Sequence, residues 1–101
     1  MRDLKDKPLS PDEEEHLRCC GAVGFTIAQV AIIFELDKME VTRQFSQKQG
    51  TVYDLYMEGR YQNELEIKQA VLQSAKNGST PAQQQILEYY ASVDSELRDL
   101  D

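Results

Sequence analysis

The sequence has little of what builds a metal site or a disulfide framework. Its 101 residues include one histidine, His16, and two adjacent cysteines, Cys19 and Cys20. Neighbouring residues of a helix point about 100° apart, so these thiols do not pair easily. No Cys-x-x-Cys pair is present to hold zinc. We therefore predict two reduced thiols, no bound metal and a cytoplasmic protein.

Tryptophan is absent, aromatic residues make up 8% of the chain, and long hydrophobic runs are missing. The longest apolar run, Val30 to Phe34, is far too short to span a bilayer. The N-terminus also lacks the apolar stretch of a signal peptide. We expect no membrane contact. The core of so short a chain is modest, and oligomerisation would add buried area.

Residues that carry catalysis are missing as well. His16 follows Glu13 to Glu15, which are most simply the acidic first turn of a helix. No nucleophile stands at a usable spacing from this histidine. The segment Gly21 to Gly24 has neither the spacing nor the lysine of a phosphate-binding loop. We predict that the protein is not an enzyme and carries no cofactor.

What is present is helical, and we predict an all-α fold. Residues 1–9 are charged and contain a proline, which favours a flexible arm. Ser10 to Glu13 are typical of a helix start with a capping box. This first helix should run to about Ala22, with Leu17 and one of the two cysteines inward, and end at Gly21 and Gly24.

The segment Phe25 to Gln49 predicts two short helices joined by a turn. Thr26 caps residues 27–34, and Asp37 caps a helix from Lys38 to about Gln49, which Gly50 ends. Ala31 stands where the two helices must approach closely. The other expected core positions of this pattern are Val30, Phe34, Leu36, Val41 and Phe45. The pattern is typical of a helix-turn-helix, so residues 10–50 are predicted to form a DNA-binding head.

The second half of the chain, residues 51–101, predicts a helical hairpin that forms oligomers. A capped start at Thr51 opens a helix of about 27 residues that stops at Asn77-Gly78. Gly59 inside it predicts a kink, a break or a close helix contact. Thr80-Pro81 starts the last helix. One apolar stripe runs along that helix: Ala82, Ile86, Tyr90, Val93, Leu97 and Leu100.

The DNA-reading residues of a helix-turn-helix lie on the outer face of its second helix. Here that face carries the residue types that reach base edges and phosphates: Lys38, Thr42, Arg43, Ser46 and Gln47. Thr26 and Gln29 open the first of the two helices, where backbone amides can meet a phosphate. The charge argues the other way. Residues 25–50 hold three acidic and three basic side chains, and the whole chain has a net charge of −7.

The long helix of the second half carries Gly59-Arg60 and ends in Ala75-x-x-Gly78, a short polar cap follows, and the final helix opens with Pro81-Ala82. In this order of parts the chain resembles the small terminase subunits of tailed bacteriophages, over roughly residues 25–90. The resemblance implies a non-enzymatic DNA-recognition component of a genome-packaging motor, in the bacterial host cytoplasm. It also implies a homo-oligomer built by residues 51–98. The acidic end, Asp94 to Asp101, would contact the large terminase subunit.

Two other functions remain open from the sequence. A helix-turn-helix transcriptional regulator would use the hairpin to form a two-fold dimer on palindromic DNA. A structural interaction module would use the same helical corner without touching nucleic acid. The cancelled charge of residues 25–50 favours the second of these alternatives.

Overall fold

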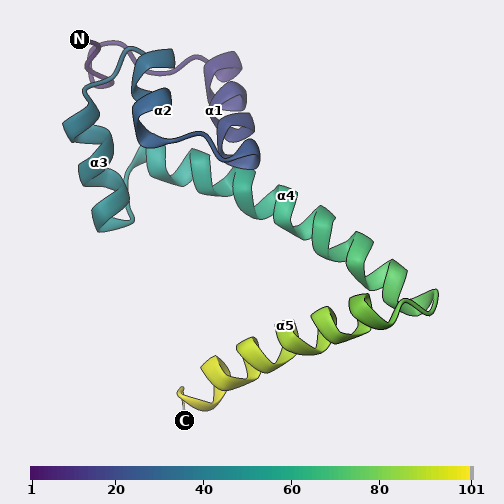
Figure 1. The fold of residues 1–101 in the computed structure, drawn as a ribbon. Helices are drawn as coiled ribbons and strands as arrows, with labels where there is room; N and C mark the ends of the chain where they lie inside the picture. The colour runs from purple at the N-terminus through teal and green to yellow at the C-terminus, as the bar shows by residue number, and fades with distance from the viewer. Residues whose placement is uncertain (101) are drawn as a thin grey trace. The chain divides into compact units, whose positions relative to one another are not determined.

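The computed structural model describes residues 1–100, and in this range the chain forms five α-helices and no β-strand (Figure 1). The prediction of an all-α fold is confirmed. The helices are α1 (Pro11–Val23), α2 (Ile27–Ile33), α3 (Lys38–Gln47), α4 (Thr51–Lys76) and α5 (Thr80–Arg98). The chain divides into two compact units, one from Met1 to Glu64 and one from Leu65 onward. The boundary between these two units falls inside α4.

Helix α1 begins as the sequence predicts. The Ser10 side chain accepts a hydrogen bond from the Glu13 amide, and the Glu13 carboxylate accepts one from the Ser10 amide. Gly24 ends the helix in the left-handed conformation, with φ of 79°. Gly21, predicted to help end it, lies inside the helix instead. Because Gly21 has no side chain, α4 can pack closely against α1 at this position, and the residue forms no turn.

Helices α1 and α4 cross at two glycines. A Cβ on Gly21 would lie 1.8 Å from the Tyr56 carbonyl oxygen, and a Cβ on Gly59 would lie 1.8 Å from the Arg18 carbonyl oxygen. Each glycine therefore admits the backbone of the other helix. Helix α4 continues unbroken through Gly59. Of the outcomes expected at this residue, the close helix contact occurs and the break does not.

This crossing helps to explain why the first unit extends to Glu64. The first turns of α4 pack into the same core as α1, α2 and the start of α3. The side chains of this core are hydrophobic residues from all four helices and the turn: Leu17, Cys20, Val30, Ala31, Phe34, Leu36, Val41, Val52, Leu55 and Tyr56. Phe45 packs against it and is half-buried. The Tyr56 hydroxyl donates a 2.7 Å hydrogen bond to the Phe25 carbonyl, which satisfies it at the core edge.

The side chain that caps the start of helix α4 comes from another helix, α3. The sequence suggests that Thr51 caps α4, yet Thr51 is its first helical residue. Gln44 of α3 is buried and its Oε1 accepts from the amides of Val52 and Tyr53, at 2.9 and 3.3 Å. Two of the amides that a helix start leaves without a partner are thereby satisfied. A Cβ on Gly50 would lie 2.4 Å from this Gln44 oxygen, so glycine makes room for the cap.

Residues 1–9, the predicted arm, belong to the first unit, and Arg2 binds them to the rest of it. The Arg2 guanidinium binds the Glu13 carboxylate with both terminal nitrogens, at 2.5 and 2.9 Å. It also donates to the carbonyls of Lys7 and Pro8. The Arg2 backbone amide donates to the Glu35 carbonyl at 2.9 Å. One arginine thus connects the start of α1 with the turn between α2 and α3.

The second unit consists of the end of α4, the turn at Gly78 and α5. Ser79 caps α5 by accepting from the Ala82 amide. Ala75 and Ala82 are its only buried residues within 65–100, and the Gln83 side chain donates to the Ala75 carbonyl at 3.0 Å. The Lys68 ammonium lies 4.5 Å from the centre of the Tyr89 ring, a cation–π distance. Small residues and polar contacts hold this unit together.

Candidate nucleic-acid interface

The candidate interface is the corner formed by α2 and α3. Thr26 starts α2 through a reciprocal capping box with Gln29, and Asp37 starts α3 by accepting from the Met39 amide. Val30 and Ala31 of α2 and Val41 of α3 are buried in the common core. The helical pattern of apolar residues therefore turns the opposite face of α3 to solvent.

The turn between the two helices contains a strained residue. Glu35 has φ of 57°, in the left-handed region that residues with a side chain rarely adopt. Its amide donates to the Ile32 carbonyl, and the Leu36 amide donates to the Ala31 carbonyl at 2.8 Å. Leu36 is then buried, which fixes the direction of the chain into α3. Burial of Leu36 and the Arg2 contact offset the local cost of a positive φ.

The five predicted DNA-reading side chains of α3 are all exposed: Lys38, Thr42, Arg43, Ser46 and Gln47. Sequence periodicity is sufficient to find them, because they avoid the positions of Val41, Gln44 and Phe45. Met39 lies on the same exposed helix with 80% of its surface accessible. The sequence prediction did not include this apolar side chain in the surface.

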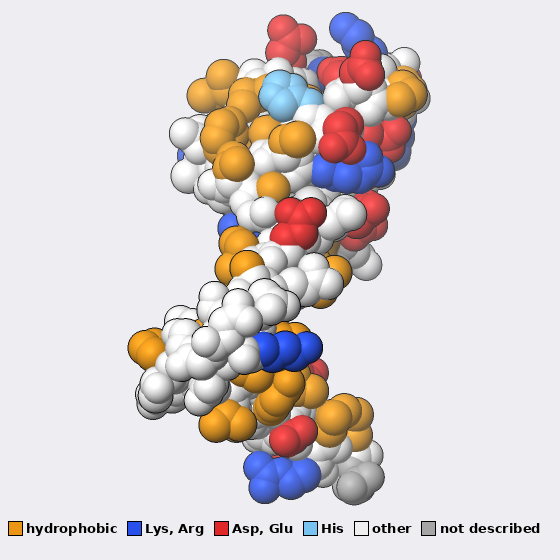
Figure 2. Space-filling model, turned by 90° about the vertical axis from the view of Figure 1, so that its right-hand side faces the viewer, with side chains coloured by type: hydrophobic (Ala, Val, Ile, Leu, Met, Phe, Trp, Pro, Cys, Tyr) orange, Lys and Arg blue, Asp and Glu red, His pale blue; other side chains and the backbone are white. Residues whose placement is uncertain are grey.

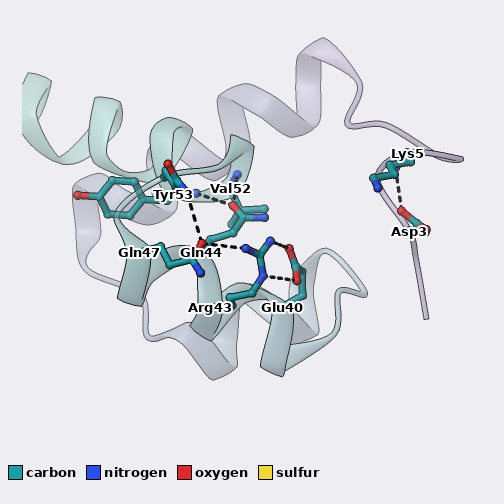
Figure 3. A network of polar contacts seen from close by, with 9 residues as sticks. Asp3, Lys5, Glu40, Arg43, Gln44, Gln47, Val52 and Tyr53 are labelled. Carbon is teal, nitrogen blue, oxygen red and sulfur yellow. Dashed lines mark hydrogen bonds and ion pairs between the residues drawn. The ribbon is translucent and has the colours of Figure 1, made fainter.

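Arg43 is held by its neighbours on the helix (Figure 3). Its guanidinium forms two hydrogen bonds to the Glu40 carboxylate, one of them 2.9 Å from Nε to Oε2, and Nη1 donates to the Gln47 side chain at 2.8 Å. The hydrogen bond from Arg43 lowers the pKa of Glu40, and Glu40 in turn raises the pKa of Arg43. Glu40 thus neutralises the arginine best suited to guanine.

Other predicted contacts are also partly engaged within the chain. The Thr42 hydroxyl donates to the Lys38 carbonyl at 2.8 Å. Thr26 and Gln29, predicted to open a phosphate contact, bind each other's backbone amides. Thr26 precedes α2 as its N-cap and Gln29 lies in the first turn of that helix, so both are outside the α3 face. The structure therefore brings together the five α3 residues and leaves Thr26 and Gln29 in a capping role.

Charges of both signs are mixed over the surface of the first unit, as Figure 2 shows for one face. The face shown is the one on the side of α1, and it carries no continuous basic patch of the kind that most duplex-binding surfaces have. Among residues 1–100, no three His, Cys, Asp or Glu side chains are placed to hold a metal ion. Cys19 and Cys20 are free thiols, and burial raises the pKa of Cys20. The described helices include none with the length and apolar character to cross a membrane.

Comparisons of the chain with protein-family models, with curated proteins and with solved structures find no match.

Proposed function

We propose that the chain is a non-catalytic DNA-recognition subunit, similar to the small terminase subunits of tailed bacteriophages. In this proposal α2 and α3 form a helix-turn-helix, and the outer face of α3 enters the major groove. The supporting observation is that five polar or basic α3 side chains share an exposed face while Ala31 and Val41 are buried behind them.

The Glu40–Arg43 pair does not prevent this contact. About half of each side chain is accessible to solvent, 54% for Arg43 and 48% for Glu40. Exposed ion pairs contribute little because water already solvates both charges. A guanine edge or a phosphate can therefore replace Glu40 as the partner of Arg43 at small cost.

A single head of this kind binds DNA weakly. Residues 25–50 have no net charge, so few counterions are released on binding. Several heads in one assembly gain effective concentration and act together. Within residues 51–98, the exposed apolar side chains of Leu65, Ile67 and Leu87 support such an assembly. A ring fits the packaging subunit, whereas a two-fold dimer fits the transcriptional regulator. Measurement of the mass in solution separates the two.

The acidic C-terminal end is the proposed contact to a large terminase subunit. Asp94, Glu96 and Asp99 are exposed there, with Arg98 as the one basic residue between 94 and 101. Asp101, the last residue of this end, lies outside the described residues.

The test measures, by fluorescence anisotropy at low salt, how tightly the protein binds duplex DNA from phage genome ends. Arg43→Ala and Lys38→Ala should each weaken binding several-fold, and loss of a phosphate contact should reduce the salt slope by about one. Lys76→Ala is the matched control, since Lys76 is exposed at the end of α4. Equal binding by all four proteins would remove the α3 face as the contact surface.

A second candidate, an interaction module without DNA contact, is favoured by one observation. Ile32 and Met39, both about four-fifths exposed, flank a corner whose arginine is already neutralised. Glu40→Gln distinguishes the two functions because it releases Arg43. Tighter DNA binding by this variant supports the DNA-recognition subunit. Undetectable binding by both wild type and Glu40→Gln at low salt supports the interaction module.

A further inference from the structure

A regular apolar seam runs along α5 and continues to Leu100, two residues past the end of the helix. Its residues repeat at spacings of four and three, the heptad spacing of coiled-coil helices: Ile86, Tyr90, Val93, Leu97 and Leu100. Ile86 is half-buried, whereas the other four are between 52% and 77% exposed. Figure 2 shows hydrophobic side chains at the surface of the second unit. A helix that keeps such a seam in water lacks the partner that the spacing fits.

The area of the seam is that of a small interface. A half-exposed Leu, Ile or Tyr presents on the order of 100 Å². The four more exposed residues of the seam therefore present roughly 400 Å² on one side, below the roughly 800 Å² of a standard interface. An interface of this size is expected to be transient, so charges beside the seam decide which helix binds.

The charges beside the seam are acidic on both sides. With Tyr90 and Leu97 at heptad position a, Asp94 falls at position e and Glu96 at position g. Positions e and g of one helix face those of its partner across the seam. A second copy of α5, parallel or antiparallel, would therefore bring an acidic flank against an acidic flank.

We infer that the α5 seam docks an amphipathic helix of another protein, one with apolar residues at a and d and Lys or Arg at e and g. Opposite charges at these positions select the partner and its orientation. This inference deepens the partner contact of the proposed function and rests on it only in treating the acidic C-terminal end as a binding surface. DNA contact by α3 has no part in it.

The test uses the full chain and three labelled synthetic peptides of equal length. Binding of each peptide is measured by fluorescence anisotropy at about 0.1 M salt. One peptide has Leu at a and d with Lys at e and g. The second replaces these Lys by Glu. The third is residues 80–101 of this chain and stands for a second copy. We expect the Lys peptide to bind at least 10-fold more tightly than either of the other two.

Two variants separate docking on the seam from general attraction to an acidic protein. Leu97→Glu places a charge in the seam, and Ser95→Glu places the same charge at heptad position f, away from it. General attraction would tighten Lys-peptide binding to both. Docking predicts a loss of at least 10-fold for Leu97→Glu and unchanged or slightly tighter binding for Ser95→Glu. Circular dichroism of both variants checks that α5 remains helical.

Three results would overturn the inference. They are no binding of the Lys peptide, equal binding of the Lys and Glu peptides, and tightest binding of the residue 80–101 peptide, which would assign the seam to a second copy. Leu97 is far along the chain from α3. The effect of Leu97→Glu on peptide binding is therefore measured independently of the effect of Arg43→Ala on DNA binding. Failure of one proposal is thereby distinguished from failure of the other.

Discussion

The two units of the chain treat their hydrophobic side chains in opposite ways. In the first unit ten core residues from α1 to the start of α4 lie buried together, and helices cross at glycines with backbones in contact. In the second unit, within residues 65–100, burial is limited to Ala75 and Ala82, while large apolar side chains such as Leu87 and Leu97 remain more than half exposed. The first unit has a core of its own. The second exposes its apolar side chains as one partner of a protein–protein interface does.

This difference indicates where partners act. Burial of apolar area is the main stabilising contribution to folding, so the first unit can be stable alone while the second gains most when a partner covers it. The candidate DNA surface lies on the unit with the rigid core. The candidate protein surface lies on the unit that lacks one.

The largest expected contrast comes from the same deletion in each unit. Leu17 is fully buried, so Leu17→Ala should lower the free energy of unfolding by about 3 kcal/mol through lost burial and a cavity. Leu97 is 54% exposed, so Leu97→Ala should change it by less than about 0.5 kcal/mol in the monomeric chain. Urea unfolding of dilute protein measures both. Similar losses in the two variants would mean that the units do not differ in packing.

Glycine substitutions sharpen the comparison at a smaller scale. Gly59→Ala should destabilise by about 2 kcal/mol, because the new Cβ meets the Arg18 backbone and the gain in helix propensity only partly offsets this. Gly78→Ala, in the second unit, meets no atom within 4 Å and should cost about 1 kcal/mol through its φ of 101° alone. Thermal unfolding orders the two. A larger loss at Gly78 would argue against the close crossing of α1 and α4.

The remote cap of α4 should contribute a further, smaller effect. Gln44→Ala leaves the Val52 and Tyr53 amides without their acceptor and should cost about 1 kcal/mol. Gln47→Ala, one turn away on the exposed face, is the matched control and should stay within about 0.5 kcal/mol of wild type. Chemical denaturation measures both. An unchanged midpoint for Gln44→Ala would show that water serves as well as this side chain.

The smallest expected effect is a pH dependence in the first unit. The hydrogen bond from Arg2 lowers the pKa of Glu13 from its ordinary 4.5 to about 2. A carboxylate with a lowered folded pKa stabilises fully above pH 4.5, and this stabilisation is lost as the pH falls towards 2. Thermal unfolding of wild type and Glu13→Gln should therefore differ above pH 4.5 and converge near pH 2. Glu14→Gln is the control, and a constant gap across this range would refute the Arg2–Glu13 contribution.

Helix starts and core positions could be predicted from the sequence because they depend on local signals. Ser10, Thr26 and Asp37 cap helices as expected, and Val30, Phe34 and Val41 are buried as the apolar spacing predicts. The same spacing finds the exposed α3 face. Capping and amphipathic periodicity are properties of neighbouring residues, so one sequence is enough to detect them.

What could not be predicted depends on residues far apart in the chain. Gln44 caps a helix that begins seven residues later, Arg2 binds Glu13 across the first loop, and Gly21 receives the backbone of α4. At the candidate interface, the pairing of Arg43 with Glu40 was visible only as a helical spacing of three. The spacing of the apolar stripe of α5 follows from the sequence, but its exposure beyond Ile86 requires the structure.

Hydrogen exchange of the full chain, at a concentration where its mass is that of a monomer, tests most directly whether the units differ in self-sufficiency. Amides in α1, α3 and the first turns of α4 should exchange slowly, through opening of the common core. Amides in α5 should exchange orders of magnitude faster and slow down when the Lys-flanked peptide is added. Exchange of α5 in the free monomer as slow as that of α1 would contradict the account, because it would show that the second unit needs no partner.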